Sequence, residues 1–246
     1  EISKGLVGSE MCIRDRSVTV IDANDAPSIT SASTASVAEN QTAAIDVNHS
    51  DVDGDTITYT LSGGADSALF NINATTGVVT FKAAPNFEVA GDANGGNDYV
   101  IEVTATDNGT GTLTATQTIT ITVTDANDAP AITSASTASV AENQTSAIDV
   151  NHSDADGDTI TYTLTGSVDD ALFNINATTG VVTFKAAPNF ESAGDANTDN
   201  DYVIEVTATD DGTGTLTATQ TITITVTNAN DAPAITSAST ASVAEN

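Results

Sequence analysis

The sequence predicts an all-β protein in which a two-sheet Greek-key sandwich occurs twice in tandem. Residues 28–130 and 131–233 align without a gap and differ at only 12 of 103 positions. Within each unit, apolar residues and threonines alternate with a period of two, as in half-buried strands. Clusters of Gly, Asp and Asn separate these segments, which is typical of turns. A unit of this size can hold a hydrophobic core of its own, so we expect two separate domains.

The repeat also predicts the organisation of the rest of the chain. Residues 17–27, "SVTVIDANDAP", match the end of a repeat, so we expect them to be the last strand and linker of a preceding domain. Residues 234–246 match the start of a further repeat. We therefore interpret the chain as an excerpt from a longer protein.

The first sixteen residues differ in composition from the repeats. "EISKGLVGSEMCIRDR" (1–16) holds the only Cys, the only Met and both Arg of the chain. It resembles a translated sequencing-adapter segment, so we expect it to be non-native and exclude it from the fold prediction. Because the only cysteine lies there, the repeats offer no disulfide.

Each repeat contains about seven segments with strand character. In the first repeat we expect strands, in chain order, at 35–38, 43–48, 56–61, 69–72, 78–82, 98–107 and 118–124. "ADSAL" (65–69) is expected to form a single helical turn. In "TITITVT" (118–124), the alternation places Ile119, Ile121 and Val123 on the inner face.

The aromatic residues support a packed sandwich. All ten fall at equivalent positions of the two repeats: Tyr59, Phe70, Phe81, Phe87 and Tyr99, then Tyr162, Phe173, Phe184, Phe190 and Tyr202. Most stand on the inward phase of a strand, so we expect them in the core. A surface platform for sugars would need exposed aromatics instead.

The charge of the chain excludes several classes of function. The chain has 34 acidic and 5 basic residues, for a formal net charge of −29. Nucleic acid is excluded as a partner because phosphate contacts need Lys and Arg. No apolar run is long enough to cross a membrane. No Ser-His-Asp set, cysteine nucleophile or phosphate-binding loop is present, so we do not expect an enzyme.

The acids are grouped at five places in each repeat. These are "AEN", "DVDGD" or "DADGD", "NFE", "ATDNG" or "ATDDG", and the linker "DANDAP". Carboxylates, side-chain amides and backbone carbonyls are hard oxygen ligands, of which Ca²⁺ takes six to eight. Zinc, copper and iron fit poorly, because each repeat has one His and no Cys. The sequence therefore predicts calcium sites.

These five motifs, in this order and at this spacing, resemble a cadherin-type repeat of large bacterial surface proteins. The resemblance covers nearly all of residues 17–246. It implies tandem immunoglobulin-like sandwiches joined end to end, with about three Ca²⁺ ions at each complete junction.

The resemblance implies one complete junction and two partial ones. The complete junction would use Glu39, Glu88, Asp125, Asn127, Asp128, the carbonyl of Ala129, Asp154, Asp156 and Asp210. The downstream half of the first junction would use Asp22, Asn24, Asp25, Asp51, Asp53 and Asp107. The upstream half of the last junction would use Glu142, Glu191, Asn230 and Asp231.

The chain departs from the family pattern at two places. The family's Asp-Arg-Glu triplet is Asn-Phe-Glu here, so Asn86 and Asn189 replace a carboxylate and put the outermost ion in doubt. The third linker has Asn228 where the others have Asp. We interpret Asp55 and Asp158 as turn residues, because Asp and Gly favour turns.

The predicted function is that of calcium-rigidified extracellular or cell-surface repeats of an adhesin. Calcium is the expected partner, with identical repeats or cell-surface or matrix ligands as further partners through homophilic or other adhesion. One alternative is an accessory module of a large extracellular hydrolase, for polysaccharide binding or spacing. Another is a sandwich array whose linkers stay flexible and ignore calcium; it would gain if Asp125 and Asp128 pointed away from Glu39.

Overall fold

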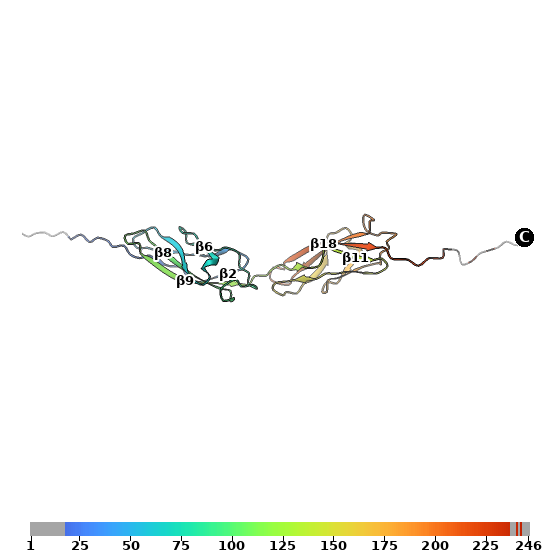
Figure 1. Cartoon of the computed structure of the whole chain (residues 1–246), viewed down its shortest axis with the longest axis horizontal. Helices are drawn as coiled ribbons and strands as arrows, with labels where there is room; N and C mark the ends of the chain where they lie inside the picture. The colour runs from blue at the N-terminus through green and yellow to red at the C-terminus, as the bar shows by residue number, and fades with distance from the viewer. Residues whose placement is uncertain (1–17, 237–239, 241, 243–246) are drawn as a thin grey trace, which may run out of the picture. The chain divides into compact units, whose positions relative to one another are not determined.

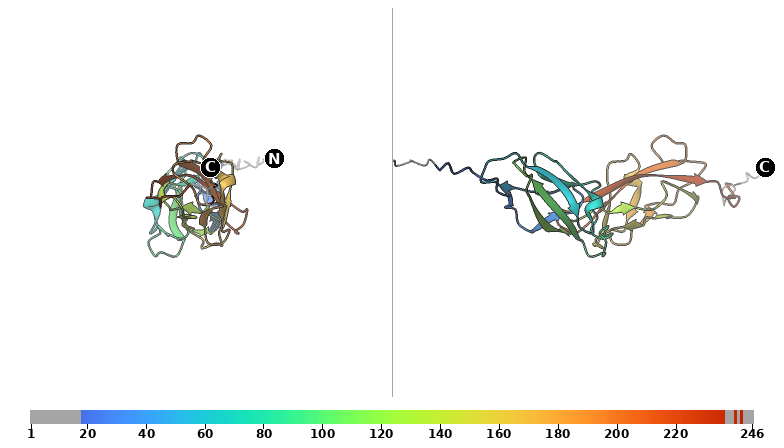
Figure 2. Two further views of the ribbon diagram at one scale, coloured as in Figure 1. Left: turned by 90° about the vertical axis from the view of Figure 1, so that its right-hand side faces the viewer. Right: turned by 60° about the vertical axis from the view of Figure 1, so that its left-hand side comes forward.

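The computed structural model describes residues 18–236, 240 and 242 (Figure 1). The segment 1–16 and most of the expected further repeat at 234–246 lie outside the described residues. The described chain divides between Thr124 and Asp125 into two compact units. Figure 2 shows the strands of the first unit in blue to green and those of the second in yellow to red.

The first unit contains nine strands and one short 3-10 helix. In chain order they are β1 (Ser28–Ile29), β2 (Thr34–Ala38), β3 (Ala43–Asp46), β4 (His49–Ser50), β5 (Thr58–Gly63), η1 (Ser67–Leu69), β6 (Phe70–Ile72), β7 (Val78–Phe81), β8 (Asp98–Thr106) and β9 (Thr114–Thr124).

The second unit repeats this order. Its elements are β10 (Ala131–Ile132), β11 (Thr137–Ala141), β12 (Ser146–Asp149), β13 (His152–Ser153), β14 (Thr161–Leu164), η2 (Asp170–Leu172), β15 (Phe173–Ile175), β16 (Val181–Phe184), β17 (Asp201–Thr209) and β18 (Thr217–Thr227).

Each unit is a sandwich of two main sheets. The first unit has a four-stranded sheet, β2-β9-β8-β5, and a three-stranded sheet, β3-β7-β6, while β1 pairs with β4. The second unit has the same three sheets in the same order. All pairs are antiparallel except β2 with β9 and β11 with β18, which are parallel. The predicted fold class, all-β with two tandem sandwiches, is confirmed.

Strand alternation builds the core as the sequence predicts. Ile119 and Ile121 are fully buried and Val123 is 1% exposed, while the threonines between them face outward or are partly covered. On the neighbouring strand β8, Tyr99, Ile101, Val103 and Ala105 are buried in the same way. Burial of such side chains contributes about 1.5–3 kcal/mol each, so this strand pair supplies much of the unit's stability.

An aromatic cluster fills one part of each core. In the first unit the rings of Phe70 and Phe81 lie 4.3 Å apart, and Tyr99 meets Phe81 edge to face at 5.2 Å. Of the ten aromatics, Phe87 and its equivalent Phe190 are half-buried and the other eight are buried. The aromatic residues therefore serve the core, as predicted.

Local departures from the predicted strands have physical reasons. Strand β9 begins at Thr114, four residues before the expected 118, because it pairs with the whole length of β8, with Thr106 opposite Thr114. Strand β3 ends at Asp46, and His49–Ser50 turns away to pair with β1. The expected helical turn is η1, a 3-10 turn at Ser67–Leu69.

The topology places acids at two opposite ends of each unit. Glu39 follows β2, which runs parallel to β9, so it lies beside the end of β9 at Thr124. Asp107 follows β8, which runs the other way, so it lies at the other end of the same sheet. The nine residues of β8 separate the two ends by about 30 Å.

The core should be sensitive to cavity formation. We expect Ile121→Ala to lower the free energy of unfolding of the first unit by about 2–5 kcal/mol, because a fully buried side chain leaves a cavity. Thr118→Ala, at an exposed position of the same strand, should change it by less than about 0.5 kcal/mol. Urea denaturation of the two variants measures both values, and equal losses would contradict the assigned faces.

Candidate metal centre

The Asp-x-Asp-Gly-Asp turn brings three carboxylates together in each unit. In the first unit, oxygens of Asp51, Asp53 and Asp55 lie within 4.8 Å of one another. The turn precedes β5, and its shape depends on Gly54, whose φ of 75° is in the left-handed region. The backbone N–H of Asp55 donates to Asp51 Oδ1 at 3.0 Å and closes the turn.

The second unit has the same arrangement. Oxygens of Asp154, Asp156 and Asp158 lie within 4.8 Å of one another, and all three residues are half-buried. The N–H of Asp158 donates to Asp154 Oδ1 at 3.0 Å. The cluster therefore belongs to the repeat and does not depend on the surroundings of one unit.

A buried aspartate after the long central strand stands beside each cluster. Asp210 follows β17 and is 3% exposed. Its Oδ1 accepts the N–H groups of Gly212 at 3.2 Å and Leu216 at 2.9 Å. Its Oδ2 accepts the amide of Asn127 at 3.0 Å, which ties the linker to the sheet. Asp107 holds Asn24 in the same way at 3.0 Å.

A second hydrogen bond holds each linker to the acidic turn. The N–H of Asp128 donates to Asp156 Oδ2 at 2.6 Å, and the N–H of Asp25 donates to Asp53 Oδ2 at 2.7 Å. In both units the "DANDAP" segment therefore lies against the unit that follows it, through its Asn and its second Asp. The sequence predicted that the linker and the acidic turn belong to one site, and the structure places them in contact through these hydrogen bonds.

Several oxygens of the clusters have no hydrogen-bond partner. Asp51 Oδ2, Asp154 Oδ2 and Asp158 Oδ2 are buried without one. The described lysines do not compensate them, because Lys82 and Lys185 donate to the carbonyls of Ala68 and Ala171. A buried polar atom without a partner is costly. A hard cation is the partner that this oxygen-only donor set fits, so the residues present fit calcium.

A polar cavity borders the cluster in each unit. In the second unit it measures about 390 Å³, and its lining residues are Asp125, Ala126, Asn127, Asp156, Asp158, Gly212 and Thr213. In the first unit the equivalent cavity measures about 240 Å³, and its lining residues are Asp22, Ala23, Asn24, Asp53, Asp55, Gly109 and Thr110. Asp22, which joins no carboxylate cluster, is thus placed at the rim of this cavity.

Mutual repulsion is visible at the third aspartate of the turn. Burial raises the pKa of Asp55, and the charges of Asp51, Asp107 and Asp53 raise it further. Burial likewise raises the pKa of Asp158, helped by Asp154, Asp211, Asp156 and Asp210. The interpretation of these two residues as turn residues only therefore missed that their carboxylates belong to the cluster. The period of two in Asp-x-Asp-x-Asp was the signal in the sequence.

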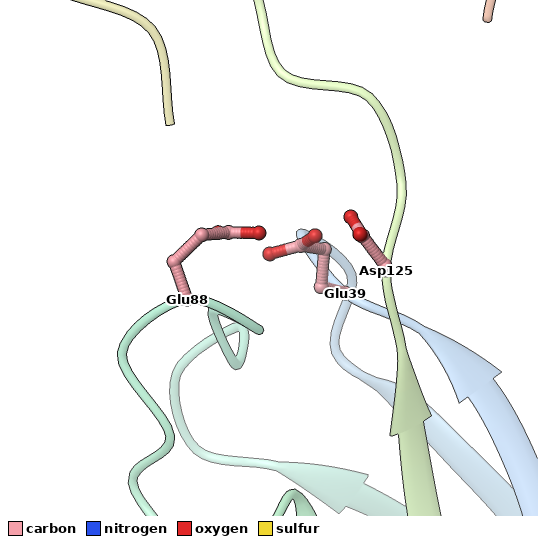
Figure 3. Close-up of side chains that lie close together, drawn as sticks. All are labelled: Glu39, Glu88 and Asp125. Carbon is pink, nitrogen blue, oxygen red and sulfur yellow. The ribbon is translucent and has the colours of Figure 1, made fainter. Parts of the chain in front are cut away.

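A different carboxylate cluster lies at the other end of β9. Oxygens of Glu39, Glu88 and Asp125 lie within 4.8 Å of one another. Figure 3 shows the three side chains converging from the β2 end, the "NFE" loop and the residue that follows β9. Glu39 is 3% exposed, and its Oε2 accepts the N–H of Phe87 at 2.7 Å. Asp125 thus points toward Glu39, as the calcium interpretation requires.

The equivalent cluster of the second unit differs in one carboxylate. Glu142, Glu191 and Asp231 come together there. Asn228, which stands where the first unit has Asp125, donates its amide to Glu191 Oε1 at 2.7 Å. The N–H groups of Ala229 and Phe190 lower the pKa of Glu142. The exchange of Asp for Asn thus replaces a repelling charge by a hydrogen bond.

Other predicted ligands are placed with fewer contacts. The amide of Asn230 makes only a long contact of 3.5 Å to the Asp231 carbonyl among the bonds described, and Ala129 is exposed. Asn86 Oδ1 accepts the N–H of Val89 at 2.6 Å and so closes the loop that contains Glu88. This bond gives the amide that replaces the family's carboxylate a structural role.

The two histidines lie apart from these clusters. His49 and His152 are exposed residues of β4 and β13. Their Nδ1 atoms contact the hydroxyls of Tyr59 and Tyr162 at 2.5 Å and 2.6 Å. Burial raises the pKa of Tyr59. The pair joins a strand end to the core.

Some buried acids are structural, and they lie outside the five acidic motifs of the repeat. Asp66, 3% exposed, accepts the N–H groups of Ala93 and Val100, both at 2.7 Å. Asp92, 8% exposed, accepts those of Asn94, Gly96 and Asn97 and shapes the loop before β8. Burial alone would raise the pKa of Asp92, but these backbone donors outweigh it and lower the pKa. Their oxygens are satisfied, unlike Asp51 Oδ2, Asp154 Oδ2 and Asp158 Oδ2.

Comparison with known proteins identifies the family. The sequence profile described as "Cadherin domain" matches residues 33–124 and 136–227, about three quarters of the chain. The chain therefore belongs to the cadherin family and contains two cadherin domains in tandem. These domains are typically extracellular, calcium-binding adhesion modules. The comparison finds no catalytic domain.

One solved structure supports the fold. Human protocadherin-24 EC1-2 aligns with a TM-score of 0.53 at 20% identity, covering 84% of this chain and 100% of that one. Protocadherin gammaB7 EC3-6 aligns with a TM-score of 0.46 at 22% identity, covering 82% of this chain and 52% of that one. The chain thus spans about half the length of that relative. No curated protein sequence matches the chain.

None of the helices that the structure describes could span a membrane, since both are single 3-10 turns of three residues.

The stabilisation by aspartates that accept backbone hydrogen bonds should depend on pH. Because the pKa of Asp92 is lower in the folded state, its charge stabilises the fold above the ordinary Asp pKa, and this contribution disappears as the pH falls through the folded value. We expect Asp92→Asn to lower the melting temperature at pH 7, and the difference from wild type to shrink toward pH 3. Melting curves across pH 3–7 measure it. A constant difference would contradict the assigned cause.

Proposed function

We propose that this chain is a calcium-stiffened spacer and adhesion segment of a cell-surface or secreted adhesin. The observation that carries the proposal is the cluster of Asp154, Asp156 and Asp158, with buried unpartnered oxygens, to which the linker is tied through Asn127 and Asp128. The two bonds hold the linker against the acids that calcium would cross-link.

The proposed ligand set of the complete junction has nearly balanced charge. Its carboxylates are Glu39, Glu88, Asp125, Asp128, Asp154, Asp156 and Asp210, with Asn127 and the Ala129 carbonyl as neutral ligands. Seven carboxylates carry a charge of −7, against +6 for three dications. We propose the same chemistry for the partial sets, one around Asp51, Asp53 and Asp107 and one around Glu142, Glu191 and Asp231.

The carboxylates at the linker would make its stiffness depend on calcium. Without cations, like charges repel one another at the linker and oppose compact structure. Calcium, when bound, supplies the positive charge that lets these carboxylates converge. The linker is then held to both the preceding and the following domain, and its conformational freedom falls. We infer that the segment stiffens and holds an end domain away from the cell.

Adhesion and origin are finer parts of the proposal. Attachment through identical repeats or through cell-surface or matrix ligands is supported by membership of the cadherin family. A bacterial source is a prediction from the sequence motifs alone. The alternative of a polysaccharide-binding accessory module gains no support from the described aromatics, since eight of the ten are buried and two are half-buried. The alternative of flexible linkers that do not bind calcium is less favoured, because the carboxylates of Asp125 and Glu39 lie within 4.8 Å of each other.

Calcium titration of the full chain tests the proposal. We expect the melting temperature to rise at millimolar Ca²⁺, since extracellular modules bind with a Kd of about 10⁻⁴–10⁻³ M. At tenfold excess over Kd each ion adds roughly 1.4 kcal/mol. Small-angle scattering should show a larger maximum dimension in Ca²⁺ than in EDTA.

A double variant serves as the matched control. Asp128→Ala with Asp156→Ala should abolish both effects, because it removes two proposed ligands of the same junction. Asp98→Ala, which removes an acid from the start of β8, should leave the calcium response in place. A wild-type chain whose melting and scattering ignore calcium would show that the linker is only a connection.

A further inference from the structure

We propose that the third carboxylate of each Asp-x-Asp-Gly-Asp turn, Asp55 in the first unit and Asp158 in the second, is a direct calcium ligand. This inference rests on the proposed function and adds one charged ligand to each half-site. It concerns residues that the sequence had assigned to turn formation alone.

The turn does not account for the carboxylate of Asp158. The turn is closed by its backbone N–H, which donates to Asp154 Oδ1. An asparagine or glycine at this position could make that bond equally well. The side chain instead brings its Oδ2 into a buried position without a hydrogen-bond partner, within 4.8 Å of oxygens of Asp154 and Asp156. Burying a charged oxygen in this way needs compensation.

The missing side chain of a glycine lets two of the oxygens lie against its backbone. A methyl group added to Gly212 would overlap both Asn127 Oδ1 and Asp158 Oδ2. The φ of Gly212 lies outside the left-handed region, so the backbone does not demand glycine there. In the first unit, Gly109 has the same relation to Asn24 Oδ1 and Asp55 Oδ2. The amide oxygen and the third carboxylate thus lie together against the glycine, and all three residues line the polar cavity of their unit.

The ligand class follows from the donors around this volume. They are carboxylate and amide oxygens without nitrogen or sulfur ligands, which suits Ca²⁺. Asp210 adds a further carboxylate, whose Oδ2 accepts the amide of the same Asn127. Affinity in calcium sites depends on the number of charged ligands.

The two units differ in one further charge. Asp211 stands where the first unit has Asn108, and each accepts a backbone N–H, of Thr159 or Thr56, at 2.8 Å. The hydrogen bond is thus unchanged, while the second unit gains a negative charge close to Asp158. The second half-site should consequently attract the cation more strongly.

The test is calcium binding to the full chain, measured by equilibrium dialysis with ⁴⁵Ca²⁺ and by thermal melting with and without EDTA. We expect Asp158→Asn to weaken one bound ion at least tenfold or to remove it. In EDTA the same variant should melt at a higher temperature than wild type, because a repelling charge is gone. The opposite signs distinguish a ligand from a residue that only shapes the turn.

Matched variants complete the experiment. Asp201→Asn makes the same charge change at the other end of β17 and should leave both readouts unchanged. Asp55→Asn repeats the test independently in the first unit. Gly212→Ala should weaken the same ion as Asp158→Asn, because its methyl group would displace Asn127 Oδ1 and Asp158 Oδ2.

Each outcome has a defined meaning. If wild type binds calcium and Asp158→Asn and Asp55→Asn bind it within twofold of wild type, the inference is wrong while the proposed function stands. If wild type binds no calcium, both are wrong. If Asp158→Asn lowers the melting temperature in EDTA and in calcium alike, the residue is structural and the inference is again overturned.

Discussion

The mutual repulsion of carboxylates held at the strand ends is the constraint on which the rest of this protein depends. Each sandwich gathers acids at both ends of its long sheet, and the described lysines are bonded to backbone carbonyls elsewhere. Such an arrangement opposes its own compaction unless a cation joins it. The acidic composition is thus concentrated at specific places, which are the proposed calcium sites.

The sandwich can hold these acids together because the stability of its hydrophobic core offsets the repulsion between their charges. Long paired strands such as β8 and β9 bury an unbroken row of apolar side chains and fix the positions at which the chain leaves the sheet. Glu39 and Asp125 therefore meet at one end, and Asp107 stands at the other. The linker is tied by two hydrogen bonds to the following unit, which orients its oxygens before any ion binds.

Hydrogen bonds distinguish two kinds of acid in this fold, and the proposed ligands Glu39 and Asp210, which are buried and accept N–H groups, share features of both. Asp66 and Asp92 accept several backbone N–H groups and hold loops in place. Asp154 and Asp158 each retain a buried oxygen without such a donor. The first kind stabilises the fold without metal, whereas the second is destabilising until its charge is compensated. Burial alone does not distinguish a structural acid from a candidate ligand.

The sequence by itself determined the repeat, the all-β class, most strands, the inward face of Ile119 and Ile121, and the grouping of acids, because period, alternation and turn residues are local properties. It did not predict the short pairing of β1 with β4 or the full length of β9, since strand pairing depends on partners distant in the chain. Only the tertiary structure decided which oxygens converge. The sequence around Asp158 predicts only a turn residue. Folding, however, brings its carboxylate beside Asn127 and Gly212, which are 31 and 54 residues away in sequence.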